Sequence, residues 1–210
     1  MTDLIAYRGE QVSLAAMSRD YLQLFMEHAN DLSVTRGILM RPPITLEMEQ
    51  EWFDSLHKRS ATDNIFAILL NTEDGKHRYI GHTGLHHMSW PNGTATTGSI
   101  IIDKTLHGAG YGTEAKLLLL YHAFYVKGLR KVSSEVKAFN GNSYGHLVKC
   151  GYQCIGCRKA HDFDEGTYVD NFLFEVFKED FGPLWARYQE TKKLPVLTDE
   201  QRKHILEVIT

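Results

Sequence analysis

The sequence predicts a mixed α/β fold (class α+β), and three observations support this. Short apolar runs typical of strands alternate with stretches whose apolar residues recur at helical spacing. The 210 residues suit one main domain with a terminal extension and are enough to bury a sizeable core. Hydrophobic residues make up 43% of the chain and charged residues 23%, as in ordinary globular proteins. The expected order of elements is β-α-α-β-β-β-α-β-α-β-β.

The first half of the chain carries signals for two helices and four strands. Pro42 and Pro43 interrupt the helical pattern between the two helices. Thr45 is a residue type that caps helices, and Trp52 and Phe53 lie on the apolar face of the helix that follows it. In chain order we expect a strand around Val12–Leu14, a helix from about Arg19 to Asn30, the helix after Thr45, and strands at 64–71, 78–90 and 94–103.

The second half begins with a glycine-rich turn that opens onto a long apolar helix. After it we expect a strand at 130–139, a short helix at 140–150, and strands at 152–163 and 167–178. The tail predicts two short helices on either side of Pro195. We therefore divide the chain into a domain at 1–181 and a helical extension at 182–210, which we expect to serve packing or partner contact rather than chemistry.

Charge and hydropathy exclude several classes of protein. The net charge is −3, and the sequence shows no basic stripe of the kind that binds nucleic acid. No secretory signal is visible, and no run of about 18 apolar residues predicts a membrane span. The expectation is a cytoplasmic enzyme or binding protein with no nucleic-acid or membrane partner.

The stretch GSIIIDKTLHGAGYGTEA, which starts at residue 98, places three glycines between a strand and a helix. Such turns allow backbone amides to approach a ligand closely, usually a phosphate. The glycines at 108, 110 and 112 are one residue short of the dinucleotide-binding spacing, and the lysine of a P-loop is missing.

The loop HGAGYGTEA resembles the corresponding loop of the GNAT superfamily of acetyl-CoA-dependent N-acetyltransferases. The family signature Arg/Gln-x-x-Gly-x-Gly/Ala is matched at Gly110 and Gly112, with His107 where arginine or glutamine is usual. The phrases YIGHTGL, NGNS, KCGY and YVDNFLFEVFKEDF are similar to those of the branch that contains the ribosomal-protein N-terminal acetyltransferases and the spermidine acetyltransferases. The resemblance covers about Gly9 to Phe181 and implies a mixed, mostly antiparallel central sheet flanked by helices.

The resemblance implies acetyl-CoA as co-substrate and no metal. The loop amides would hold the pyrophosphate at a helix N-terminus, and the edge of the fourth strand would pair with the pantetheine arm. A strand amide near Ile101 would polarise the thioester carbonyl. The residues expected to bind the cofactor are Ile100, Ile101, Ile102, His107, Gly108, Ala109, Gly110, Tyr111, Gly112, Thr113, Asn140 and Ser143.

Two residues are the expected catalytic groups. Glu135 matches a family position that accepts the proton of the amine through water, and Ser143 matches one that donates to the departing thiolate, with Tyr144 as its alternative. Their sequence context also fits plain structural roles, because Glu135 fits a strand glutamate paired to a basic residue. Asn140 and Ser143 likewise fit the start of a helix.

Histidines and an aspartate compete with Glu135 for the role of base. These rivals are His82, His86, His87 and Asp31. His82 and His86 also lie on one strand face, a spacing that suits a fortuitous metal pair.

The three cysteines at 150, 154 and 157 form C-x3-C-x2-C, a spacing that matches the cluster-binding motif of radical enzymes. We expect this match to be accidental and the thiols to be reduced, because the motif lies near the end of the chain and its context predicts a helix end followed by a strand.

The expected function is direct transfer of an acetyl group to a primary amine, either a protein N-terminus, a polyamine or another small amine. The alternative is a non-catalytic acyl-CoA-binding or regulatory module of the same fold. The sequence does not identify the acceptor, and it leaves a homodimer open.

Overall fold

The computed structural model describes residues 3–38 and 43–209, so the expected break at Pro42 lies outside the described residues. The strands are β1 (Ile5–Arg8), β2 (Val12–Ala16), β3 (Asn64–Asn71), β4 (His77–Ser89), β5 (Thr94–Ile101), β6 (Lys131–Lys137), β7 (Gln153–Asp164) and β8 (Thr167–Phe177). The α-helices are α1 (Asp20–Ala29), α2 (Leu32–Thr35), α3 (Leu46–Ser55), α4 (Tyr111–Tyr121), α5 (Gly141–Lys149), α6 (Lys178–Thr191) and α7 (Asp199–Ile209).

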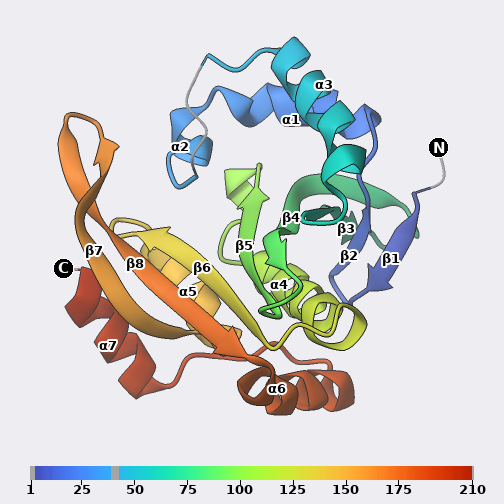
Figure 1. Ribbon diagram of the computed structural model, residues 1–210. Helices are drawn as coiled ribbons and strands as arrows, with labels where there is room; N and C mark the ends of the chain where they lie inside the picture. The colour runs from blue at the N-terminus through green and yellow to red at the C-terminus, as the bar shows by residue number, and fades with distance from the viewer. Residues whose placement is uncertain (1–2, 39–42, 210) are drawn as a thin grey trace.

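The described strands form one eight-stranded sheet in the order β1-β2-β3-β4-β5-β6-β8-β7 (Figure 1). Every neighbouring pair is antiparallel except β5 and β6, which are parallel. The predicted mixed, mostly antiparallel sheet flanked by helices is therefore confirmed.

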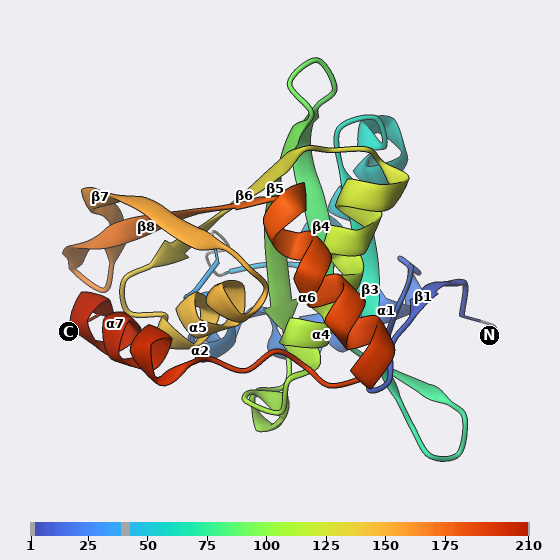
Figure 2. The ribbon, with the colours of Figure 1, turned by 90° about the horizontal axis from the view of Figure 1, so that it is seen from below.

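Helices cover both faces of the sheet. On one face, Tyr21 and Phe25 of α1 pack with Ile100 and Ile102 at the end of β5. On the other face, the leucines at 117–120 of α4 belong to the larger core, which α5, α6 and α7 complete. Figures 1 and 2 show these two layers, with α6 lying across α4. Because α4 lies between the sheet and α6, it is apolar on nearly every side.

Local signals position the helix starts. The Thr45 hydroxyl accepts a hydrogen bond from the Met48 amide at 3.3 Å, which confirms the predicted cap of α3. The Asn140 side chain accepts from the Ser143 amide at 3.2 Å and caps α5 in the same way. Strand β1 and helix α2 were not predicted, because segments of four residues are too short to show a period.

The C-terminal residues pack into the main core. Phe181, Tyr188 and Ile205 are buried in the same cluster as the leucines of α4. Helix α6 begins at Lys178, so the boundary at 181/182 falls inside a helix. Pro195 lies between α6 and α7, as the sequence predicts.

Candidate active site

Strands β5 and β6 separate after a short stretch of pairing. Residues 94–96 pair with residues 131–133, and the described strands form no further ladder pairs beyond them. β5 stays paired with β4 as far as Ile101, and β6 stays paired with β8 as far as Lys137. The hydroxyls of Thr97 and Ser134 still donate to the carbonyl oxygens of Ser133 and Thr97 across the two strands. The facing edges beyond Thr97 and Ser134 therefore offer backbone groups to a ligand that can pair like a strand.

Ile101 turns its backbone toward this separation. The Ile102 amide donates to Ile80 of β4 at 3.0 Å, and ladder bonds alternate along a strand, so the Ile101 amide faces away from β4. The side chains of Ile100 and Ile102 are buried on the α1 face. Ile101 is thus the member of the isoleucine run whose amide fits the predicted thioester contact.

The glycine loop ends β5 and begins α4. Gly108 and Gly110 have φ of 81° and 98°, a left-handed conformation that favours glycine. Among the described residues, none accepts a hydrogen bond from the amides of residues 108–113. This run includes the predicted residues Ala109, Tyr111, Gly112 and Thr113 and lies at the positive end of the helix dipole.

His107 is turned back toward the strand. Its Nε2 lies 3.0 Å from the Ile101 carbonyl oxygen, and because that oxygen can only accept, the ring carries its proton on Nε2. The nearest lysine of the loop, Lys104, pairs with Asp31 at 3.2 Å. The anion-binding capacity of the loop therefore rests on its backbone amides.

Glu114 anchors the first turn of α4. Its buried carboxylate accepts from the amides of Glu10, Gln11 and Val12 at 2.8–2.9 Å and from the Tyr188 hydroxyl. One side chain thus joins the β1–β2 turn, α4 and α6, which fixes the helix start that carries the glycine loop.

The segment after α6 lies directly on this loop. Leu194 Cδ1 is 2.7 Å from the position that a Cβ on Gly110 would occupy, and Leu197 Cδ1 is 3.5 Å from the corresponding position at Gly145 of α5. The extension therefore contacts both helices at the candidate cofactor site, which sequence patterns alone cannot indicate.

At the start of α5, Ser143 and Tyr144 differ in their surroundings. The Ser143 side chain is partly exposed and its hydroxyl has no hydrogen-bond partner among the described residues. Tyr144 is 1% exposed and packs edge-on against Phe172 and Phe174. Burial raises the pKa of Tyr144 to about 12. Of the two predicted proton donors, Ser143 is the more accessible.

Glu135 projects from the part of β6 that no longer pairs with β5. Its Oε1 forms an ion pair with Arg158 at 2.8 Å, and its Oε2 accepts from Asn171 at 3.3 Å. Nearly half of its side-chain surface is exposed. The geometry is compatible with both the structural and the catalytic interpretation of this residue.

The rival bases are less suited to deprotonating an amine. Burial lowers the pKa of His82 to about 4, and the neighbouring His86 adds to the effect. Burial also lowers the pKa of His86. Efficient general bases have a pKa closer to the working pH. His87 is exposed beside Thr96, and Asp31 caps α2.

Lys116 is a buried cation beside α5. It is 1% exposed, and no described residue accepts a hydrogen bond from it or pairs with it. Burial lowers its pKa to about 8, although the nearby Cys150 thiol opposes the shift. Burial lowers the pKa of His146 to about 3, with Lys116 contributing, and His146 Nε2 is sealed without a partner.

Glu49 of α3 was missed by the sequence analysis. It is 7% exposed, has no ion pair or hydrogen bond among the described residues, and burial raises its pKa. It lies three and four residues before Trp52 and Phe53, so an acidic residue within an apolar stripe was the available signal.

The three cysteines lie on two different elements. Cys150 is buried at the end of α5, while Cys154 and Cys157 lie on β7 and are free. In the part of the chain that the structure describes, no group of three potential ligands could hold a metal. The described helices also include none that is long and apolar enough to cross a membrane.

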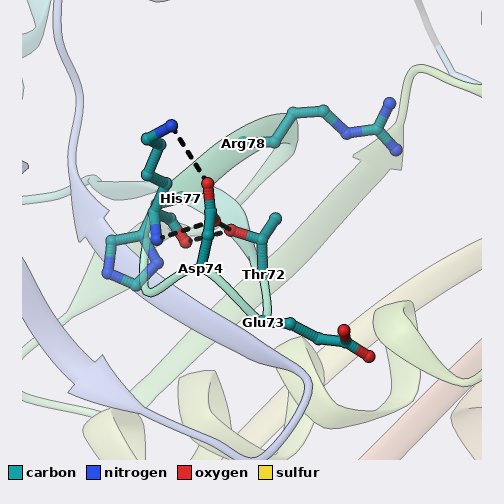
Figure 3. Close-up of a pocket in the computed structure, with 6 residues that line it drawn as sticks. Thr72, Glu73, Asp74, His77 and Arg78 are labelled. Carbon is teal, nitrogen blue, oxygen red and sulfur yellow. Dashed lines mark hydrogen bonds and ion pairs between the residues drawn. The ribbon is translucent and has the colours of Figure 1, made fainter.

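Two surface depressions lie at turns of the sheet. One is lined by residues of the β3–β4 turn, with Lys76 paired to Asp74 at 3.0 Å and Thr72 bonded to both (Figure 3). Thr72, Asp74 and Lys76 thus bond one another within this turn. A second depression lies where Arg36 forms ion pairs with Asp164 and Glu165 near the β7–β8 turn.

Comparison with protein families assigns the chain. Residues 12–153 match the model of the acetyltransferase (GNAT) domain, and this span contains the separated strands, the glycine loop, Glu135 and Ser143. The chain belongs to the GNAT acetyltransferase family. As a member of it, the protein is an N-acetyltransferase, which confirms the predicted family and enzyme class.

Solved structures share this GNAT fold. A putative acetyltransferase is 25% identical over 87% of this chain and 91% of its own, with a TM-score of 0.70. Spermidine N-acetyltransferase from Vibrio cholerae, in complex with CoA and spermine, is 19% identical over 81% and 98%, with a TM-score of 0.72. Mycobacterium smegmatis RimJ, in complex with CoA-disulfide, is 17% identical over 89% and 91%, with a TM-score of 0.74. A search of curated proteins gave no match.

Proposed function

We propose that this GNAT enzyme transfers the acetyl group of acetyl-CoA directly to a primary amine of a protein N-terminus, a polyamine or another small molecule. The observation that carries the proposal is the run of amides at 108–113, which have no partner among the described residues and lie after the edge where β5 leaves β6. That arrangement suits a pyrophosphate joined to an extended arm. The CoA complexes of the Vibrio cholerae and Mycobacterium smegmatis proteins support the same cofactor.

The proposed roles follow from the contacts. The Ile101 amide polarises the thioester carbonyl as the amine attacks. Glu135 accepts the proton of the amine through water, and the Ser143 hydroxyl donates a proton to the departing thiolate. The C–S bond breaks as the C–N bond forms, so the products are the amide and CoA.

A route through an acetylated cysteine is less suited to this chain. Burial raises the pKa of Cys150 to about 12, and burial also raises the pKa of Cys157. Raised pKa values keep thiols protonated and weakly nucleophilic. Transfer in a ternary complex needs no such thiol.

The test is a panel of primary amines assayed by thiol release from acetyl-CoA. With an accepted amine, Glu135→Gln should lower turnover about 10²–10⁴-fold at neutral pH and recover at high pH, where the amine is already neutral. Glu175→Gln is the matched control, because Glu175 pairs with Lys131 on the same sheet. Equal turnover of wild type and Glu135→Gln at every pH would exclude Glu135 as the base, and no thiol release with any amine would contradict the proposed function.

A further inference from the structure

The segment between α6 and α7 is short and is fixed at both ends. At the end of α6, Lys192 has a left-handed φ of 57° that turns the chain, and its amide donates to the Tyr188 carbonyl oxygen at 2.8 Å. At the start of α7, the Thr198 hydroxyl accepts from the Gln201 amide at 3.1 Å, and the Gln201 side chain accepts from the Thr198 amide at 2.9 Å. We call residues 192–198 the strap.

The sequence restricts the middle of the strap. Pro195 has a fixed φ, and its ring disfavours the helical conformation for Leu194 before it. The strap accordingly forms neither helix nor strand. Leu194 and Leu197 pack against the main core, whereas Val196 between them is 74% exposed. The strap therefore turns its leucines toward the body of the protein.

One of these leucines rests on the glycine loop. Leu194 Cδ1 lies 2.7 Å from the position that a Cβ on Gly110 would occupy, and Gln11 Nε2 of the β1–β2 turn lies 3.8 Å from the same position. Figure 2 shows the strap running from α6 past the start of α4 toward α5. Gly110, with its φ of 98°, is thus held between the strap and the β1–β2 turn.

The loop depends on such outside contacts because its own amides do not order it. The amides of residues 108–113 donate to no described residue, and Gly108, Gly110 and Gly112 give the loop wide conformational freedom. Ordering a flexible residue costs conformational entropy. A loop that is already ordered loses less entropy when a ligand binds, and it therefore binds more tightly.

The strap also reaches the second helix of the candidate cofactor site. Leu197 Cδ1 lies 3.5 Å from the Cβ position on Gly145, and Ile205 Cδ1 of α7 lies 3.9 Å from it. Gly145 is two residues after Ser143 on α5. The strap thus spans the starts of α4 and α5, which both carry residues expected to bind the cofactor.

We propose that Leu194 is a positioning residue of the acetyl-CoA site. Its contact holds Gly110 in the left-handed conformation and keeps the amides of residues 108–113 aimed at the pyrophosphate. This inference rests on the proposed function. Leu194 touches no reacting atom, so it acts on cofactor affinity rather than on acetyl transfer. The C-terminal extension then takes part in cofactor binding, beyond the packing role that the sequence suggests.

The experiment measures CoA binding by calorimetry in a graded series of variants. Leu194→Ala should weaken binding about 5–30-fold, the range for loss of a contact of this size. Leu194→Met, which keeps the volume, should bind like wild type. Leu194→Val should be intermediate, and it decides the matter if Leu194→Ala does not fold. Val196→Ala is the matched control, because Val196 lies exposed on the same strap.

Kinetics separate positioning from a merely structural role. Leu194→Ala should raise KM for acetyl-CoA by the same factor and leave kcat and KM for the amine unchanged. A structural role alone would reduce the amount of folded enzyme, and so the apparent kcat, without changing CoA affinity. Such a result, or equal CoA affinity of wild type, Leu194→Val and Leu194→Ala, would overturn this inference alone. Absence of CoA binding to wild type would contradict the proposed function as well.

Discussion

Replacement of Lys116 by methionine should stabilise the protein. The lysine lies between α4 and α5 with 1% of its surface exposed and no acidic partner among the described residues. Methionine has a similar length, adapts to irregular space and carries no charge to desolvate. Lys116→Met therefore removes an electrostatic cost while keeping most of the packing.

The magnitude follows from the pKa of the lysine. Burial lowers it from 10.5 to about 8. At about 1.4 kcal/mol for each pH unit, the charged form destabilises the native state by roughly 3 kcal/mol at pH 7. For a chain of this size that corresponds to a rise of about 10 °C in Tm for Lys116→Met.

The stability difference between Lys116→Met and wild type should also change with pH in a definite direction. Between pH 8 and 10.5 the unfolded chain holds the proton on Lys116 and the native state has released it, so wild-type stability rises with pH in this window. The advantage of Lys116→Met should be complete below pH 8 and should disappear by about pH 10.5. Urea unfolding at pH 7, 9 and 10.5 measures the difference. A variant that is no more stable at pH 7, or whose advantage does not change with pH, would refute the reasoning.

Two further predictions concern the loop and the thiols. Gly108→Val should weaken CoA binding more than tenfold, because a branched side chain would stand in front of the loop amides. Gly128→Val is the control, since both glycines have positive φ and open space around them. Equal CoA affinity of the two variants in calorimetry would argue against the loop as the phosphate site. Replacement of Cys154 and Cys157 by serine should leave turnover unchanged. The purified wild-type protein should contain no stoichiometric iron or zinc by elemental analysis. One cluster per chain would reverse our interpretation of the motif.

The long elements of this fold could be predicted from local patterns. The strands from β3 to β8 follow from apolar runs bounded by turn residues, and Thr45 marks the start of α3 through its own hydroxyl. β1 could not be found because four residues with alternating exposure carry little signal, and its pairing with β2 supplies the rest.

The candidate site likewise consists of one part that local patterns predict and another part that they do not. The glycine loop is local, so its position between strand and helix could be predicted from the sequence. The contacts of the other residues join distant segments: Glu135 meets Arg158 and Asn171 across neighbouring strands, and Leu194 meets Gly110 from 84 positions further along the chain. The sequence shows Glu49 only as an acidic residue within an apolar stripe, and its lack of a partner among the described residues is a property of the packed face.

The contact between Leu194 and Gly110 also affects when the glycine loop is fixed as the chain folds during translation. Translation delivers the glycine loop well before the segment that covers it, and Tyr188, which bonds Glu114, arrives late as well. Domains fold from the N-terminus as they emerge from the ribosome. A nascent chain that ends before residue 188 holds the complete loop sequence without two of the contacts that fix its helix. These two contacts form only after residues 188–194 have been synthesised, and a chain that is terminated earlier lacks them.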